Sequence, residues 1–270
     1  MKETIRGKAI VLTGASAGIG RAAALGLARE GARLFLVARR ADRLAEVDAE
    51  VRKLGGTAFV QALDLRHADS VKTMIRSACE KLGRIDVLIN NAAFGYFGTV
   101  EKTPPALVRE IFEVNFEAPL LASQLVIPIM KRQGGGHIIN VSSVVGKRGL
   151  PMSGIYSATK FALNGLSESL RIELRDSNIR VSLINPASTK TEFSEALRRV
   201  DVSADFGPIG HQQSAEEVAD AIVRCVHRPK LEVYPYWPSR LVAWFNVLAP
   251  SFVDAVTIRY LRERIPSHQR

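Results

Sequence analysis

Three polar residues in the middle of the chain have the types and spacing of an acid–base site. Tyr156 and Lys160 stand four residues apart, so on a helix they share one face, and Ser143 follows an apolar run typical of a buried strand. A strand end and a helix face can bring a hydroxyl, a phenol and an ammonium around one small cavity. A lysine beside a phenol favours the phenolate. The set predicts proton transfer to or from an alcohol or carbonyl oxygen, although a solvated helix can carry the same spacing.

A glycine-rich turn near the amino terminus predicts a phosphate-binding site. An apolar run over 9–12 leads into Thr-Gly-Ala-Ser-Ala-Gly-Ile-Gly, and a helical-looking stretch follows. In this context Gly14 permits the tight turn, Gly18 lets backbone approach a phosphate, and Gly20 lets the helix pack on the strand. A pyrophosphate would then lie on the helix amino terminus, where free N–H groups favour anions. A flexible turn without a ligand is the alternative.

Apolar runs alternate with amphipathic stretches along the chain, the pattern of a parallel sheet covered on both faces. With right-handed crossovers, this predicts an α/β fold with a doubly wound parallel sheet. We expect one domain over 1–235 and a helical extension over 236–270. Strands are expected near 9–13, 33–38, 57–61, 86–89, 137–142, 179–184 and 231–234. Helices are expected near 18–30, 40–54, 67–82, 105–132, 154–176 and 214–227.

The order of these motifs resembles the short-chain dehydrogenase/reductase family. The glycine spacing is Gly-x-x-x-Gly-x-Gly, and it is followed in order by Asn-Asn-Ala-Ala at 90–93, Asn115, Ser143 and Tyr156-x-x-x-Lys160. The resemblance covers roughly residues 7–230. It implies a single-domain Rossmann fold of about seven strands, a nicotinamide cofactor, hydride exchange between a carbonyl and an alcohol, and a homodimer or homotetramer.

The resemblance implies roles for four catalytic residues. Tyr156 would be the general acid/base, and Ser143 would hydrogen-bond the substrate oxygen. Lys160 would bind the nicotinamide ribose and lower the pKa of Tyr156. Asn115 would hold a water that links Lys160 to solvent, or else be a buried amide bonded to backbone. Ser142 competes with Ser143, but neighbouring strand residues point to opposite faces, and we choose Ser143.

The resemblance also implies a set of cofactor contacts. Asp64 would contact the adenine, with a helix cap as its alternative, and Thr191 would touch the nicotinamide carboxamide. Ala93 and Ala187 replace glycines that the family usually has, and alanine disfavours a positive φ. The expected cofactor-binding residues are Gly14, Ser16, Gly18, Ile19, Gly20, Arg39, Arg40, Asp64, Leu65, Asn91, Ala92, Lys160, Pro186, Thr189 and Thr191.

Two arginines after the second expected strand favour NADP(H) over NAD(H). An acidic residue at this strand end would accept bonds from the ribose hydroxyls and repel a 2′-phosphate. Ala38 stands there instead, and Arg39 and Arg40 follow it. A guanidinium fork suits a phosphate, although a basic start to an exposed helix is the alternative.

Composition places the chain among ordinary soluble globular proteins. It has 270 residues, of which 47% are hydrophobic and 24% charged. Cys79 and Cys225 show no disulfide or metal-ligand spacing, and no metal is expected. The amino terminus has no apolar signal core, which predicts a cytoplasmic location, with contact at the inner membrane face as a variant. The net charge of +10 is dispersed in doublets, so a solvated surface is favoured over a nucleic-acid partner.

Two segments outside the motifs bear on the substrate. Residues 192–213 would form a mobile segment that covers it. Apolar side chains near the motifs predict an apolar substrate pocket, although aromatic residues near a core more often serve packing. These residues are Phe94, Tyr96, Phe97, Leu150, Met152 and Phe193.

The carboxyl-terminal extension is rich in apolar and aromatic residues. Pro250 should break it into two helices, one over 237–248 and one over 252–265. Pro250, Asn246 and Asp254 argue against a transmembrane span. Three alternatives stay open: packing on the core or on a partner subunit, an interfacial membrane contact through 237–265, and a lid over the substrate entrance. The first helix places Leu241, Trp244, Phe245 and Leu248 on one face.

These observations favour an NADP(H)-dependent oxidoreductase acting on a carbonyl or secondary alcohol of an apolar small molecule. A non-catalytic NADP(H)-binding interaction or membrane-surface protein is the alternative. The intact set of Ser143, Tyr156 and Lys160 weighs against it. An epimerase or dehydratase of the extended family is disfavoured by the glycine spacing and the short chain.

Overall fold

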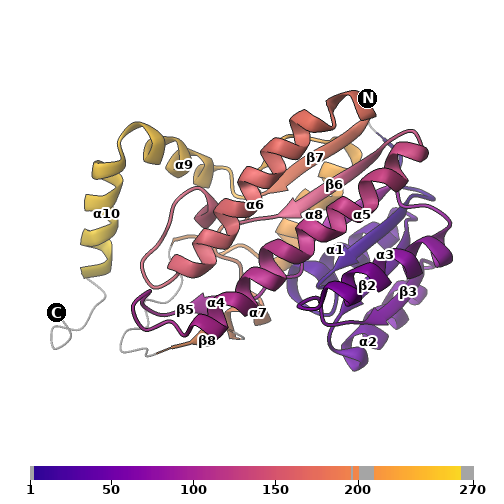
Figure 1. The fold of residues 1–270 in the computed structure, drawn as a ribbon, viewed down its shortest axis with the longest axis horizontal. Coiled ribbons are helices and arrows are strands. Elements are labelled where there is room, and N and C mark those ends of the chain that lie inside the picture. The colour runs from indigo at the N-terminus through magenta and orange to yellow at the C-terminus, as the bar shows by residue number, and fades with distance from the viewer. Residues whose placement is uncertain (1–2, 196, 201–209, 263–270) are drawn as a thin grey trace.

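A seven-stranded parallel sheet forms the centre of the protein (Figure 1). The computed structural model describes residues 3–195, 197–200 and 210–262. The strand order is β3–β2–β1–β4–β6–β7–β9, so the single-domain, doubly wound Rossmann arrangement expected from the sequence is confirmed. The sheet strands are β1 (Ala9–Thr13), β2 (Arg33–Ala38), β3 (Thr57–Ala62), β4 (Val87–Asn90), β6 (Gly136–Val141), β7 (Ile179–Ile184) and β9 (Glu232–Val233).

Helices cover both faces of the sheet because its strands are apolar on both sides. In β1, Ile10 and Leu12 pack in the core on one face, while Ala9 and Val11 pack in the core on the other. The first face is covered by α1 (Gly18–Arg29), α2 (Ala41–Lys53) and α8 (Ala215–His227). The second face is covered by α3 (Ala68–Leu82), α5 (Ala118–Arg132) and α6 (Gly154–Glu173).

The helix expected over 105–132 is interrupted. Helix α4 (Pro105–Phe112) passes into a five-residue π-turn, Glu113–Glu117, before α5 begins. A π-turn adds a residue to the helical repeat and thereby re-aims the side chains it contains; such turns are frequent at functional sites. Asn115 lies inside this turn and is buried. The helix expected over 154–176 also ends early, at Glu173, and a 3₁₀ turn follows.

The loops at the carboxyl ends of the strands carry the motifs of the sequence. The strand order reverses beside β1, which pairs with β2 on one side and β4 on the other. In open α/β sheets this switch point is where ligands bind. The glycine turn after β1 and the loops after β2, β4 and β6 therefore meet at one edge of the sheet.

The later part of the chain adds smaller elements beside this edge. Strands β5 (Tyr96–Phe97) and β8 (Arg198–Arg199) form a separate parallel pair, and α7 (Glu192–Glu195) precedes β8. The segment expected to cover the substrate, 192–213, is described except at 196 and 201–209, which lie outside the described residues.

Two helices follow the last strand at one end of the molecule (Figure 1). Helix α9 (Pro238–Leu248) lies against the body, and α10 (Pro250–Arg262) stands apart from the sheet. The predicted break at Pro250 is present, and residues 263–265 of the expected second helix lie outside the described part. Within that part, no helix has the length and apolar character to cross a bilayer.

Candidate active site

A large cleft lies at the carboxyl edge of the sheet, with a volume of about 1460 Å³. All fifteen expected cofactor-binding residues line it. Of the four expected catalytic residues, Ser143, Tyr156 and Lys160 line the cleft, and Asn115 lies behind its wall. We call the part around Gly14–Gly20, Arg39, Arg40 and Asn91 the glycine end. We call the opposite part the aromatic end; it is lined by Phe94, Phe97, Leu150, Phe193, Tyr236, Val242 and Ala243.

The glycine turn needs glycine because backbone crosses it closely. Gly14 has φ +70°, and a Cβ there would lie 2.8 Å from the Ala92 Cα. A Cβ at Gly20 would lie 2.1 Å from the Gly14 carbonyl oxygen, so only glycine lets α1 begin this close to β1. Gly18 has φ +51° and would bring a Cβ within 3.1 Å of Thr191.

Hydrogen bonds tie the glycine turn to the end of β4. The Thr13 hydroxyl accepts hydrogen bonds from the backbone N–H groups of Asn91 and Ala92, each at 3.0 Å. The Asn91 side chain in turn donates to the Thr13 carbonyl at 2.9 Å. Asn91 therefore holds the protein backbone in this structure, while its position on the cleft matches the expected cofactor contact.

The start of α1 suits an anionic group. Its N-cap is Ala17, which has no side chain to accept the free backbone N–H groups, and the first turn contains no acidic residue. Helix termini in this condition attract phosphate through N–H groups and the helix dipole. The residues present thus fit the pyrophosphate of a dinucleotide.

Charged residues extend the glycine end past β2. Arg39 and Arg40 line the cleft, and Arg40 Nη2 pairs with Glu192 Oε2 of α7 at 2.9 Å. Asp64 accepts hydrogen bonds from both the backbone N–H and the side chain of Arg66. That hydrogen bonding holds the pKa of the Asp64 carboxyl below its ordinary value, despite partial burial. Asp64 is therefore already engaged by Arg66 and still faces the cleft.

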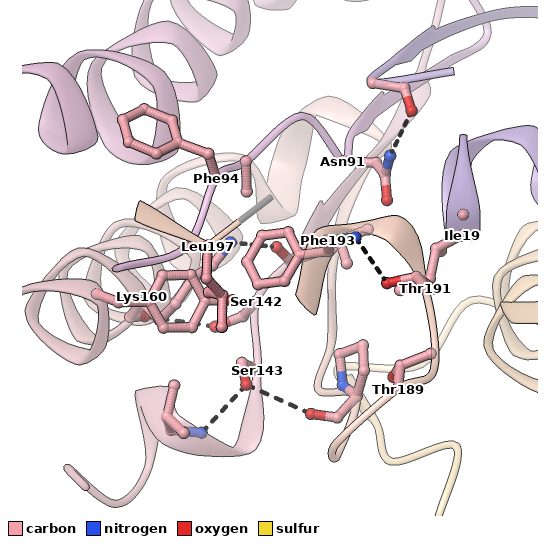
Figure 2. Close-up of a pocket in the computed structure, with 18 of the residues that line it drawn as sticks. Ile19, Asn91, Phe94, Ser142, Ser143, Lys160, Thr189, Thr191, Phe193 and Leu197 are labelled. Carbon is pink, nitrogen blue, oxygen red and sulfur yellow. Dashed lines mark hydrogen bonds between the residues drawn. The ribbon is translucent and has the colours of Figure 1, made fainter. Parts of the chain in front are cut away.

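Both serines after β6 line the cleft, so the expectation that only one of them faces it is wrong, but their hydroxyls make different contacts. Ser142 is buried, and its hydroxyl donates to the Lys160 carbonyl at 3.4 Å. The Ser143 hydroxyl accepts from the Val145 N–H at 3.3 Å and donates to the Pro186 carbonyl at 3.4 Å (Figure 2). Ser143 also forms a hydrogen bond with Tyr156, so it is the serine beside the phenol.

Burial dominates the acidity of Tyr156 and Lys160, the expected catalytic pair. It raises the pKa of Tyr156 above its ordinary value, and the hydrogen bond with Ser143 offsets this only in part. Burial also lowers the pKa of Lys160 to about 7. The direction at Tyr156 is opposite to the expected one. The Lys160 Nζ donates to the Val141 carbonyl at 2.9 Å and lies 5.6 Å from the Tyr156 ring centre.

Asn115 holds the loop after β4. Its Oδ1 accepts from the Phe94 N–H and its Nδ2 donates to the Phe94 carbonyl, both at 3.0 Å. Nδ2 also donates to the Thr159 hydroxyl at 3.3 Å, one residue from Lys160. The structure thus shows the backbone-bonded amide that was the alternative for Asn115. The expected water link to Lys160 stays a prediction.

The loop after β7 is held without a left-handed residue at Ala187. Among the described residues, only Met152 and Asn178 combine a side chain with a positive φ. The Ala187 N–H donates to Gln213 Oε1 at 2.9 Å, and Thr189 forms a bridge with Gln213. Gln213 is buried and was not foreseen from the sequence. It joins the Pro186–Thr191 loop to the start of α8.

The aromatic end closes over the tyrosine. The Phe193 ring lies 5.8 Å from the Tyr156 ring, centre to centre. The backbone N–H of Phe193 donates to the Thr191 hydroxyl (Figure 2). Leu197 packs tightly on Gly95: a Cβ at Gly95 would lie 2.2 Å from the Leu197 side chain. Of the six expected pocket residues, four line the cleft, but Tyr96 is buried and Met152 lies outside the lining.

Helix α9 forms part of the aromatic wall, a placement in line with the lid over the substrate entrance that was one of the three open alternatives. Tyr236, Val242 and Ala243 line the cleft from the extension. Tyr236 also stacks on His211, with ring centres 4.6 Å apart. The apolar periodicity of the extension predicted a helix but carried no signal for which surface that helix would meet.

Comparisons with a family model and with curated proteins indicate one family. The family model described as short chain dehydrogenase matches residues 8–201. The ketoacyl reductase HetN of Nostoc is 31% identical over 259 residues, which cover 94% of this chain and 89% of HetN.

Solved structures agree on the fold. A metagenomic short-chain oxidoreductase in complex with NADP is 34% identical, with a TM-score of 0.74 over 86% of this chain and 98% of that one. A short-chain dehydrogenase/reductase from Burkholderia phymatum, in complex with NAD, has a TM-score of 0.84 at 24% identity over 93% and 96% of the two chains. The second likeness concerns the fold alone.

Proposed function

The chain belongs to the short chain dehydrogenase family, a family of nicotinamide-dependent oxidoreductases, and we propose that it prefers NADP(H) and acts on an apolar carbonyl compound or secondary alcohol. The observation that carries the proposal is the placement of Ser143, Tyr156 and Lys160 together in a cleft whose other end suits a dinucleotide.

The charges of the glycine end support the preference for NADP(H). Ala38 ends β2 without a carboxylate, and Arg39 and Arg40 line the cleft directly after it. A 2′-phosphate would meet cations there and no acid from the strand end. The similar metagenomic structure that contains NADP points the same way.

The chemistry of the site supports an acid–base role for Tyr156. A bound nicotinamide would supply or accept the hydride. The phenol of Tyr156 is held protonated by burial, so it suits the donation of a proton to a substrate oxygen. Ser143 would hold that oxygen, since its hydroxyl lies beside the phenol. Lys160 would bind the cofactor ribose from the same face of α6.

The aromatic end supports an apolar substrate. Its wall contains phenylalanine, leucine, valine and alanine side chains, and the Phe193 ring lies against Tyr156. Arg198 and Arg199 also line the cleft and lie over the Phe94 and Phe97 rings. Pockets of this kind select by shape and by apolar area. The name of the similar Nostoc protein, a ketoacyl reductase, is consistent with a carbonyl on an apolar chain.

Three further expectations belong to this proposal. We retain the division into a domain over 1–235 and an extension over 236–270. We also retain a homodimer or homotetramer, on the resemblance to the family. We also retain a cytoplasmic location, with contact at the inner membrane face as a variant.

The test is a panel of apolar ketones and secondary alcohols, followed by the absorbance of NADPH and NADH. We expect turnover with NADPH and a clear loss of the NADPH preference in Arg39→Asp. Arg76→Asp on the exposed side of α3 is the matched control, because it makes the same charge change away from the cleft. Equal use of NADH by the unaltered protein would refute the cofactor preference.

A further inference from the structure

The exposed apolar side chains gather on the carboxyl-terminal helices. Sixteen large hydrophobic side chains are exposed among the described residues, and ten of them fall within residues 237–258. Monomeric soluble proteins rarely concentrate such residues without a binding partner. We call these ten side chains the apolar face: Trp237, Leu241, Val242, Trp244, Phe245, Val247, Leu248, Phe252, Val256 and Ile258.

Helix α9 exposes its large apolar side chains and packs its small or polar ones on the body, which is the reverse of an ordinary surface helix. Its face toward the body carries small or polar residues, Ser239, Ala243 and Asn246, which are buried or half-buried. The opposite face carries its largest apolar residues. A helix that packs on a core normally buries the large side chains. Trp237, Leu241, Trp244, Phe245 and Leu248 point away from the body, at positions three and four residues apart.

Polar contacts fix this orientation. Arg148, in the loop between β6 and α6, donates to Asn246 Oδ1 at 2.8 Å and pairs with Asp254 of α10. The Asn246 side chain donates to the Lys147 carbonyl at 3.1 Å. These bonds join both helices to the body through their polar residues. The apolar face is therefore held outward by the structure, and α10 stands clear of the sheet (Figure 1).

The charge of the same helices complements an anionic surface. Residues 237–262 contain Arg240, Arg259 and Arg262 against Asp254 alone, and the whole chain carries +10. Asp254 is paired with Arg148. The Arg240 guanidinium lies over the Trp244 ring, 4.8 Å from its centre. Tryptophan with arginine on one short helix is the composition of segments that lie in the headgroup region of a bilayer.

We propose that the apolar face docks the protein on an anionic membrane, with α9 and α10 lying in the interface. No described helix can span a bilayer, so contact from one side is the form that these helices allow. A second copy of the chain is the competing occupant. It would bring together two proteins of the same +10 charge, whereas anionic lipid would neutralise that charge.

Docking would bring the cleft close to the bilayer. Val242 belongs to the apolar face and also lines the aromatic end of the cleft, beside Ala243. A substrate dissolved in the membrane could then reach Tyr156 along α9. This last step rests on the proposed function, whereas the docking itself does not.

The two tryptophans provide a direct test, because Trp237 and Trp244 are the only ones in the chain and both are exposed. Full-length protein is mixed with vesicles of phosphatidylcholine alone or of an equimolar mixture with phosphatidylglycerol. We expect tryptophan emission to shift to shorter wavelength, and the protein to float, with the anionic vesicles only. Added salt should weaken the binding.

Variants distinguish binding through the apolar face from nonspecific binding by any exposed apolar side chain. The double variant Trp244→Ser/Phe245→Ser should bind anionic vesicles roughly tenfold or more weakly. Ile172→Ser removes an equally exposed apolar side chain from α6 and should bind like the unaltered protein. Val247→Glu is a single-site alternative at a side chain 79% exposed, should the double variant not fold.

Two results would overturn the proposal. One is unchanged emission and no flotation with either vesicle. The other is a concentration-dependent dimer that the Trp244→Ser/Phe245→Ser variant loses, which would assign the apolar face to a second copy. Vesicle binding is measured without substrate or cofactor, so an inactive protein that binds anionic vesicles would refute the proposed function and leave the docking standing.

Discussion

At the glycine end of the cleft, backbone does most of the positioning, whereas the aromatic end is built from side chains of distant segments. Gly14 and Gly20 are fixed by contacts with backbone atoms, and Asn91 locks the turn through hydrogen bonds. Phe193 and Val242 come from segments that follow β7 and β9 and meet the cleft through their side chains. The first end tolerates few residue types, while the second can change its lining without changing the fold.

The largest effect is expected at Tyr156, where the two ends meet. Tyr156→Phe removes the hydroxyl that we propose as the proton donor but keeps the ring that contacts Phe193. We expect kcat to fall roughly 1000-fold while the affinity for NADPH stays the same. Steady-state kinetics and titration of NADPH fluorescence measure the two quantities. Tyr236→Phe, in the aromatic wall, is the control; a similar loss there would place the effect in packing.

A methyl group at Gly20 should damage only the glycine end. Its Cβ would lie 2.1 Å from the Gly14 carbonyl oxygen, so the turn or the start of α1 must shift. We expect Gly20→Ala to weaken NADPH binding roughly 100-fold. Gly26→Ala lies on the same helix, where the nearest neighbour is the movable side chain of Val223 at 3.1 Å, and should bind normally. Equal affinities for NADPH would contradict the backbone account.

Low pH should destabilise the central sheet, on which both ends of the cleft are built. His137 is buried in β6, bonds Ser182 at 2.8 Å, and has its pKa lowered by burial to about 3. The unfolded chain binds the proton near pH 6.5, so stability is present above that pH and is lost as the pH falls toward 3. We expect about 2 kcal/mol of loss between pH 8 and pH 5 from this residue. Denaturant unfolding of the native protein and of His137→Gln measures the free energy of unfolding at each pH. If the two proteins lose stability in parallel as the pH falls, His137 is not the cause.

The smallest effect concerns the ion pair that joins the two ends. Arg40 and Glu192 have side chains 47% exposed, so their pair contributes at most about 1 kcal/mol. Glu192→Gln frees the Arg40 guanidinium, and NADPH should bind about 2- to 5-fold more tightly. NADH, which has no 2′-phosphate, should bind as before. Calorimetric titration of both cofactors is decisive: an equal change for both would rule out a role in phosphate recognition.

The sequence predicted the glycine end far better than the aromatic end. Every expected strand is present, because short apolar runs between turns specify a buried parallel sheet. The sequence placed the three glycines of the turn correctly at the cleft, because the backbone geometry of a tight turn depends on local residue type. These are Gly14, Gly18 and Gly20. The family motif also placed Ser143 beside Tyr156, although its role stays a prediction.

The misses share a dependence on distant contacts. The π-turn at Asn115 depends on the Phe94 backbone, and the raised pKa of Tyr156 depends on burial by elements that a local motif does not specify. The β5–β8 pair and the α9 wall join residues about a hundred or more positions apart. Periodicity reports which face of a helix is apolar, but not what that face meets.

The bond between Thr13 and Asn91 has a consequence for synthesis. The two residues lie 78 positions apart, and the glycine turn is locked only when the later one arrives. At about 5–20 residues per second, a ribosome needs roughly 4 to 16 s to make the intervening chain. Through that interval β1 also lacks β4, its neighbour on one side. Until the fourth strand emerges, the β1 side of the nascent segment is an open sheet edge, which is prone to pairing with other chains.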